Sequence, residues 1–157
     1  KKGCRRIAIV LGSKGLSISQ KRFMGYQNVL QKHNIKIDDK LIAHIDFTLE
    51  KVVKAVDNWL KLKPGIDAII SISDKSAVQI IRHLKEKKVA VPEKIRVFGF
   101  GNEFVGEIVD PALSSFDTNT KRIGEEASSL IIEQIITGKQ NLTKKIIPGK
   151  MVLRKSG

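Results

Sequence analysis

The sequence predicts an α/β fold in which helices cover a parallel β-sheet, and two observations support this prediction. Short apolar runs alternate along the chain with longer segments whose apolar residues recur at helical spacing. The segments between successive apolar runs are also long enough to hold a helical crossover, which parallel neighbouring strands require. A chain of 157 residues, 41% of them hydrophobic, can bury a core without cross-links. We therefore expect an open, three-layer α/β/α arrangement.

The first two thirds of the chain supply the regular part of this pattern. Strands are expected at the apolar runs 6–11, 41–45, 67–72 and 95–100. Helices are expected between them, over residues 20–33, 48–60 and 73–88. In the second helix Val52, Val56 and Trp59 recur at helical spacing behind Thr48, which can act as the N-cap.

The last third of the chain departs from this alternation. Residues 111–116 are expected to be extended, and they lead into a helix from about residue 119 to 137 that Gly138 ends. Apolar residues cover more than one narrow stripe of this helix, so we expect it to make contacts on two sides. Residues 144–154 are expected to form one or two strand pieces around Pro148 and Gly149, a pair typical of a sheet edge.

The charge distribution and the cysteine content limit which classes of protein the chain could belong to. The net charge is +13, and the excess lies at the two chain ends, because residues 1–37 and 134–157 contain no acidic residue. This distribution is compatible with a polyanion-binding surface or with a general solubilising bias. The single cysteine, Cys4, excludes an internal disulfide and favours a reducing, cytoplasmic location. Since no run of about 18 apolar residues occurs, no membrane span is expected, and the absence of an initiating methionine indicates a piece of a longer chain.

Signals for catalysis are weak, so we expect neither an enzyme nor a cofactor. The three histidines, His33, His44 and His83, lack the spacing of metal ligands or of a catalytic triad. Residues 12–15 are glycine-rich but match neither a P-loop nor a dinucleotide-binding turn. Asp46 and Asp74 each follow an expected strand and could pair as acids or bind a cation. Asp74 could equally cap the helix that it begins.

Signals for binding are stronger. In open parallel sheets, ligands bind beyond the carboxyl ends of the strands. Arg22 lies near that end of the first strand, where its guanidinium can donate a fork of hydrogen bonds to ligand oxygens. Phe47 lies just past the second strand, where its ring can stack on a sugar or base. These residues predict a small-molecule pocket, although each could also serve a structural purpose.

Four ordered stretches resemble the lac/purine repressor (LacI/GalR) family of transcription regulators over essentially the whole chain. They are RRIAIV (5–10) with RFMGY (22–26), DAII (67–70) and SD (73–74) with VPEKI (91–95), VFGFGN (97–102), and PALSSF (111–116) with IGEEA (123–127). The resemblance implies a two-lobed, periplasmic-binding-protein-like (type I) core that hinges around a small-molecule effector.

The resemblance also implies how the chain is divided. Residues 1–110 would form the core of the second lobe. Residues 111–143 would be a crossover strand and a helix of the first lobe, and residues 144–157 would return to the second lobe. Most of the first lobe and the helix-turn-helix that binds operator DNA would be missing from this sequence.

Functional residues carry over from the family by position. The ligand-binding candidates are Arg22, Phe47, Ser73, Asp74, Gly101, Asn102 and Thr118. Ser73 and Gly101 stand where sugar-binding members often have asparagine and aspartate, so a simple hexose effector is not implied. The resemblance places a dimer interface on the helix after Asp74 and on the segment after Asn102, with Val78, Ile81 and Phe104 as candidates.

The sequence therefore predicts the effector-binding and dimerisation module of a cytoplasmic transcription regulator. Its partners would be a sugar or nucleobase effector, a second copy of the chain and, through the missing domain, operator DNA. A solute-binding protein of a transporter shares the fold and is the first alternative. A flavodoxin-like or dehydrogenase-type enzyme is the second, and the lack of a phosphate-binding loop counts against it.

Overall fold

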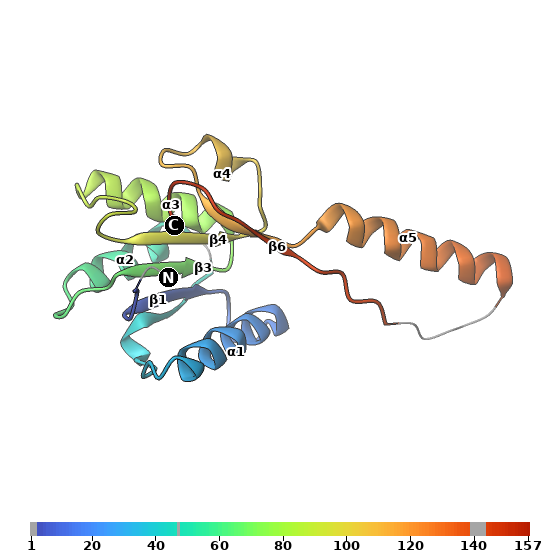
Figure 1. The fold of residues 1–157 in the computed structure, drawn as a ribbon, viewed down its shortest axis with the longest axis horizontal. Coiled ribbons are helices and arrows are strands. Elements are labelled where there is room, and N and C mark those ends of the chain that lie inside the picture. The colour runs from blue at the N-terminus through green and yellow to red at the C-terminus, as the bar shows by residue number, and fades with distance from the viewer. Residues whose placement is uncertain (1–2, 47, 139–143) are drawn as a thin grey trace.

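A six-stranded sheet forms the body of the molecule (Figure 1), as seen in a computed structural model that describes residues 3–46, 48–138 and 144–157. Its strand order is β2-β1-β3-β4-β5-β6. The strands are β1 (Ile7–Leu11), β2 (Ile42–His44), β3 (Ala68–Ser71), β4 (Arg96–Phe100), β5 (Ser114–Asp117) and β6 (Lys150–Val152). Strands β1 to β5 are parallel to their neighbours, which confirms the predicted α/β fold. Only β6 runs antiparallel, because it brings the chain back along β5 at the sheet edge.

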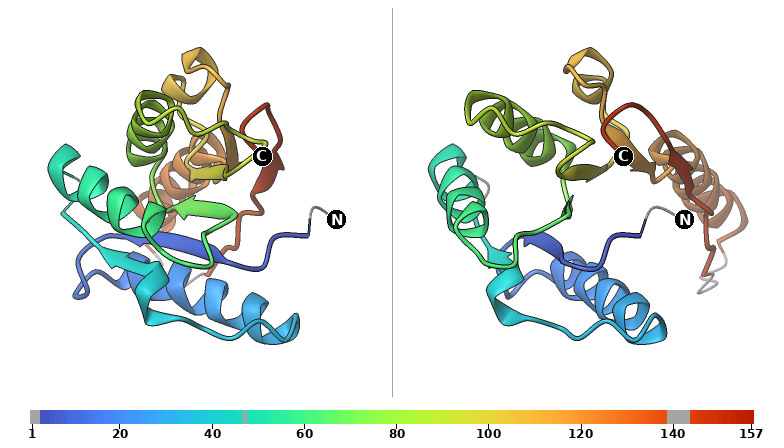
Figure 2. Two further views of the ribbon diagram at one scale, coloured as in Figure 1. Left: turned by 90° about the vertical axis from the view of Figure 1, so that its left-hand side faces the viewer. Right: turned by 60° about the vertical axis from the view of Figure 1, so that its left-hand side comes forward.

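Helices cover both faces of the sheet (Figure 2), and the crossover rule explains which helix lies on which face. The helices are α1 (Ser17–Lys32), α2 (Leu49–Leu60), α3 (Asp74–Glu86), α4 (Val105–Ile108) and α5 (Thr120–Thr137), with a 3₁₀ turn at Asp39–Leu41. From β1 to β2 the chain steps across the sheet toward one edge. From β2 to β3 and on to β4 it steps toward the opposite edge. Right-handed connections therefore place α1 on one face and both α2 and α3 on the opposite face. The short helix α4 was not predicted.

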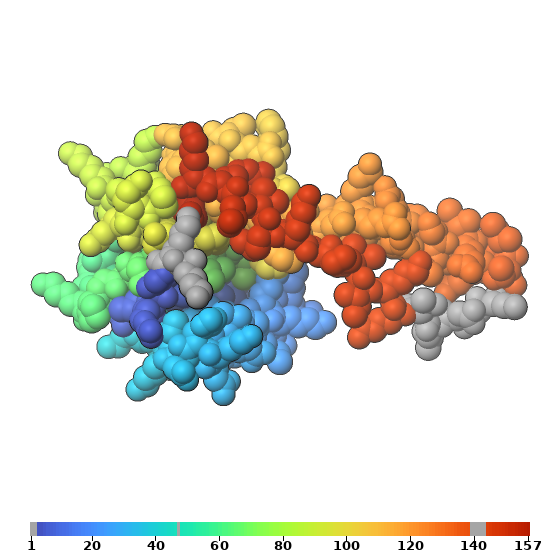
Figure 3. All heavy atoms as spheres, in the orientation of Figure 1, coloured from blue at the N-terminus to red at the C-terminus, as the bar shows by residue number. Residues whose placement is uncertain are grey.

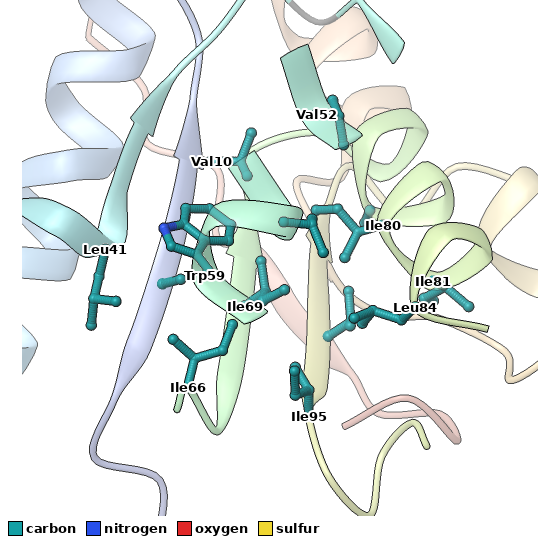
Figure 4. Close-up of a cluster of buried hydrophobic side chains, with 14 of the residues drawn as sticks. Val10, Leu41, Val52, Trp59, Ile66, Ile69, Ile80, Ile81, Leu84 and Ile95 are labelled. Atoms are coloured by element: carbon teal, nitrogen blue, oxygen red, sulfur yellow. The ribbon is translucent and has the colours of Figure 1, made fainter. Parts of the chain in front are cut away.

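The hydrophobic core has two parts, one on each side of the sheet. The larger part lies between the sheet and helices α2 and α3, where Trp59, Ile69 and Ile80 are almost fully buried (Figure 4). The Trp59 indole Nε1 donates to the Lys40 carbonyl at 2.8 Å. The smaller part joins Ile9 and Leu11 to residues of α1. Successive side chains of β1 alternate between the two parts, as strand geometry requires.

Helix α5 stands away from this body, beyond the end of the sheet (Figures 1 and 3). It has no buried residue, and its isoleucines Ile131, Ile135 and Ile136 are exposed. Gly138 ends the helix in the left-handed conformation, as predicted. The contacts predicted on two sides of α5 are not found within the residues that the structure describes. The segment after residue 143 returns to β6, and its Lys145 Nζ lies 2.6 Å from Glu126 Oε2 of the helix.

The N-cap of α2 differs from its prediction in one respect. Thr48 occupies the cap position but makes no side-chain cap hydrogen bond. Its hydroxyl instead donates to Asp46 Oδ1 at 2.8 Å. None of the helices in the described ranges is long and apolar enough to cross a membrane.

Candidate functional site

The predicted ligand-binding residues gather along the carboxyl edge of the parallel sheet. Arg22 reaches this edge from α1, while Ser73 and Asp74 follow β3. Gly101 and Asn102 follow β4, and Thr118 follows β5. Since the carboxyl ends of parallel strands meet at one edge, these segments become neighbours although they are far apart in sequence. Phe47 lies outside the described residues.

Arg22 is held in place by a carbonyl and an aromatic ring. Its Nη1 donates to the Ile72 carbonyl at 2.5 Å, and its guanidinium carbon lies 3.7 Å from the centroid of the Phe100 ring. The Phe100 ring in turn packs against Phe116, with ring centroids 5.0 Å apart. Half-burial lowers the pKa of Arg22 from its ordinary value through desolvation, but a guanidinium remains charged at neutral pH. Arg22 therefore presents an oriented cation at the sheet edge.

Asp74 lies beneath the edge and supports it. The residue is fully buried, and its two carboxylate oxygens accept hydrogen bonds from Ser115 Oγ and from the Glu103 backbone N–H, both at 2.7 Å. Ser73 is the N-cap of α3 and no side-chain cap bond forms, so the interpretation of Asp74 as a helix cap is wrong. The carboxylate instead accepts from strand β5 and from the loop after β4, and so ties the two together.

In the part of the chain that the structure describes, Asp46 and Asp74 do not pair with each other, because each has other partners. Asp46 pairs with Lys51 Nζ at 2.6 Å on the surface, and this hydrogen bond is the main cause that lowers the pKa of Asp46 to about 2. Within the described ranges, no group of three or more His, Cys, Asp or Glu side chains could hold a metal ion.

Gly101 and Asn102 form a loop whose backbone explains the glycine. Gly101 has φ +135°, a conformation that other residues rarely adopt, and Asn102 follows in the left-handed region with φ +55°. A residue with a side chain would be strained in this backbone. The Asn102 backbone N–H donates to Ser115 Oγ at 3.0 Å. Its side-chain oxygen accepts from Arg154 Nη2 at 2.8 Å.

The two remaining ligand-binding candidates, Ser73 and Thr118, have less well-defined surroundings. Ser73 and Thr118 are half-buried at the edge. Sequence reasoning missed Phe100, Ser115 and Arg154, each of which fixes a predicted residue. The position of Phe100 at the carboxyl end of an expected strand was a usable signal. No sequence signal pointed to Arg154, which reaches Asn102 only because β6 returns along the sheet.

Comparison with known proteins identifies the family. A model of the periplasmic binding protein-like domain matches residues 1–157, the whole chain. The chain belongs to this family. The domain is 27% identical over 155 residues to the HTH-type transcriptional regulator CelR of Thermobifida fusca, covering 99% of this chain and 46% of CelR. It is 31% identical over 155 residues to the HTH-type transcriptional regulator AscG of Escherichia coli K12, covering 98% of this chain and 46% of AscG.

A solved structure agrees with these relatives. The structure described as a transcriptional regulator CelR–cellobiose complex matches the domain with a TM-score of 0.90 at 27% identity, covering 99% of this chain and 47% of that chain. The resemblance to the lac/purine repressor family is thereby confirmed. These relatives are named as regulators and not as enzymes. The domain spans about half the length of the curated relatives that it matches.

The predicted interface residues of the domain differ in exposure. Phe104 is 73% exposed and Val78 is half-buried, so both present surface. Ile81 is only 1% exposed and belongs to the core beneath α3, which differs from its predicted place at an interface. Ile108 of α4 is 67% exposed and was not predicted, because α4 itself was not. Phe104 is the N-cap of α4 and Ile108 is its last residue, and this short helix packs beside α3.

Proposed function

We propose that this domain is the effector-binding module of a LacI-type transcription regulator. The observation that carries the proposal is the clamped Arg22 beside Phe100, at the sheet edge where such folds bind ligands. An oriented guanidinium next to an aromatic ring, with polar loops alongside, suits recognition of a small molecule, and the nearby Asp74 carboxylate already accepts from Ser115 and Glu103. We therefore propose a sensor rather than an enzyme, acting in the cytoplasm and without a resident cofactor.

The proposed effector is a small polar molecule of the sugar or nucleobase type. Arg22 would donate to its oxygens, while Phe47, Asn102 and Thr118 would complete the site. The lack of a carboxylate at Gly101 removes an acceptor for ligand hydroxyls, which favours a sugar larger or less simply hydroxylated than a hexose. The cellobiose complex of CelR supports the sugar class.

The proposed response is a closure of two lobes. Residues 1–110 would form one lobe, and the segment from residue 144 would return to it. Helix α5 would pack on the other lobe through its exposed isoleucines. Effector binding would favour one arrangement of the lobes and so change operator affinity through a DNA-binding domain elsewhere in the protein. Operator DNA would be contacted only through that domain.

The proposed partner is a second copy of the chain. The contact surface would comprise the exposed Phe104 at the N-cap of α4, the exposed Ile108 at its last position and the half-buried Val78 of α3. Burying such side chains contributes about 25 cal/mol per Å² of apolar area, so a twofold contact over this surface would favour a dimer. Ile81 is left out of the proposed interface.

A thermal-shift screen of the intact regulator against cellobiose, other sugars, sugar phosphates, nucleosides and purines tests the function. Saturating effector at about 100 times its Kd stabilises a protein by about 2.7 kcal/mol, which is a shift of several degrees. We expect Arg22→Ala to abolish the shift and Lys21→Ala, which removes the same charge one position away on α1, to keep it. Stabilisation only by nicotinamide or flavin cofactors would instead support an enzyme.

A further inference from the structure

Arg154 joins three separate parts of the molecule through one guanidinium. The residue follows β6, and its side chain is 16% exposed. Its Nη1 donates to the Leu113 carbonyl at 2.9 Å. Its Nη2 donates both to Asn102 Oδ1 and to Glu107 Oε1, each at 2.8 Å. The returning strand, the loop after β4 and helix α4 are therefore held by a single planar group.

The backbone of Arg154 is fixed where the side chain leaves it. The buried Ser114 hydroxyl accepts from the Arg154 N–H at 2.8 Å and donates to the Arg154 carbonyl at 3.2 Å. Because the guanidinium is a rigid fork, this anchor defines where its acceptors must lie. A lysine has one rotatable ammonium and could not satisfy the same three acceptors in this geometry.

At the effector edge, Arg154 sets the orientation of the Asn102 amide. The guanidinium can only donate, so it faces the amide oxygen, and the amide nitrogen then donates to Asp117 Oδ2 at 3.4 Å. Asn102 is one of the residues proposed to meet the effector. A ligand that draws this amide toward itself would change the hydrogen bond that Arg154 makes.

At α4, the hydrogen bond from Arg154 to Glu107 helps to stabilise a very short helix. Four residues are too few for a helix to be stable alone. The Leu113 N–H donates to the Gly106 carbonyl at 2.7 Å, and Glu107 reaches Arg154. The two exposed residues Phe104 and Ile108 flank these anchor points, so the place of the apolar surface depends on them.

We propose that Arg154 is a positioning residue that couples Asn102 at the effector edge to the α4 surface. One nitrogen serves both acceptors, so a shift of one acceptor alters the hydrogen bond to the other. The signalling purpose of this link rests on the proposed function, whereas the link itself is a property of the folded chain. Lobe movements carried by the return strand would pass to α4 through the same side chain.

Amide hydrogen exchange of the unliganded chain tests the link without any effector. We expect Asn102→Gly, which keeps the positive φ, to speed exchange in residues 105–110 about tenfold, the effect of weakening one charge-assisted hydrogen bond. In an Arg154→Lys background, the same substitution should change exchange there by less than about twofold, because the link is already broken. Peptides from α1 serve as the internal control.

The reverse direction gives a second, independent measurement. Glu107→Gln should speed exchange in residues 101–104 when Arg154 is present and leave it unchanged in Arg154→Lys. Equal effects of Asn102→Gly on exchange in both backgrounds would overturn the proposal. If Arg154→Lys does not fold, unchanged exchange of residues 101–104 in the Glu107→Gln variant would also overturn it. A failed sugar screen with intact coupling would contradict the proposed function and leave the link standing.

Discussion

At the residue scale, the site depends on a buried carboxylate whose two oxygens each accept a hydrogen bond. Asp74 is taken out of water, and such a carboxylate is tolerated only where donors replace its hydration. Ser115 and the Glu103 N–H provide them. Room for the carboxylate comes from Gly99, since a Cβ added there would lie 2.0 Å from Asp74 Oδ1 and 2.8 Å from Leu113 Cδ2.

Gly99→Ala should therefore destabilise the fold. Overpacking of this kind costs about 1–3 kcal/mol, and displacement of the buried carboxylate from its donors adds to the loss. Gly25→Ala on α1 is the matched control, because a Cβ there meets nothing within 4 Å. Alanine in a helix interior should stabilise by about 0.5–1 kcal/mol. Urea unfolding measures both, and equal stabilities for the two variants would contradict the packing argument.

At the element scale, α2 and α3 are joined by apolar packing and by a polar group at its edge. His83 of α3 is 7% exposed, and its Nε2 lies 2.8 Å from Asp57 Oδ1 of α2. Lys87 Nζ lies 3.2 Å from the same oxygen, and Glu86 Oε2 lies 3.6 Å from His83 Nδ1. The hydrogen bond from His83 is the main cause that lowers the pKa of Asp57 below its usual range.

This lowered pKa predicts a pH dependence with a defined sign. A carboxyl group whose pKa is lower in the folded state stabilises the fold above its unfolded pKa, about 3.9, and loses that contribution as pH falls through the folded value. Asp57→Asn should thus be less stable than the unmodified chain at pH 7, with a difference that shrinks below about pH 4. Urea unfolding at pH 7 and at pH 3 measures this. The exposed Glu133→Gln on α5 should show little difference at either pH, and a constant gap for Asp57→Asn would rule out the linkage.

At the scale of the whole molecule, the domain exposes large apolar side chains that do not pack into its own core. The isoleucines of α5 and the residues around α4 remain exposed although they are large and hydrophobic. Exposed apolar patches of this kind mark contacts with other surfaces. For α5 the proposed contact is the other lobe, and for α4 it is a second copy of the chain.

Phe104→Ser should weaken self-association of the domain. Removing a large aromatic residue from the centre of an interface typically costs more than about 1.4 kcal/mol, so the dimer Kd should rise about tenfold or more. Leu153→Ser is the control, because Leu153 is 70% exposed but lies beside β6. Sedimentation equilibrium over a concentration series measures the Kd of each. Equal weakening by both substitutions would show that association is a general hydrophobic effect.

Much of the fold was predictable because its signals are local. Apolar runs located four of the five parallel strands, the fifth falls in the segment expected to be extended, and helical periodicity located α1, α2, α3 and α5 within a few residues. Helix α4 escaped prediction because four residues hold too little periodicity, and it exists through contacts with Leu113 and Arg154. The antiparallel direction of β6 also depends on a return path that no local pattern records.

The sequence by itself determined the order of strands and helices along the chain, the buried face of α2 and the edge where a ligand would bind, because hydrophobic periodicity and crossover handedness act along the chain. Only the tertiary structure decided which partners fix that edge. Phe100 beneath Arg22, Ser115 on Asp74 and Arg154 on Asn102 are pairs separated by 78, 41 and 52 positions. Such contacts arise from strand order and register, and hydrogen bonds and ring contacts act over a few ångströms of space whatever the distance in sequence.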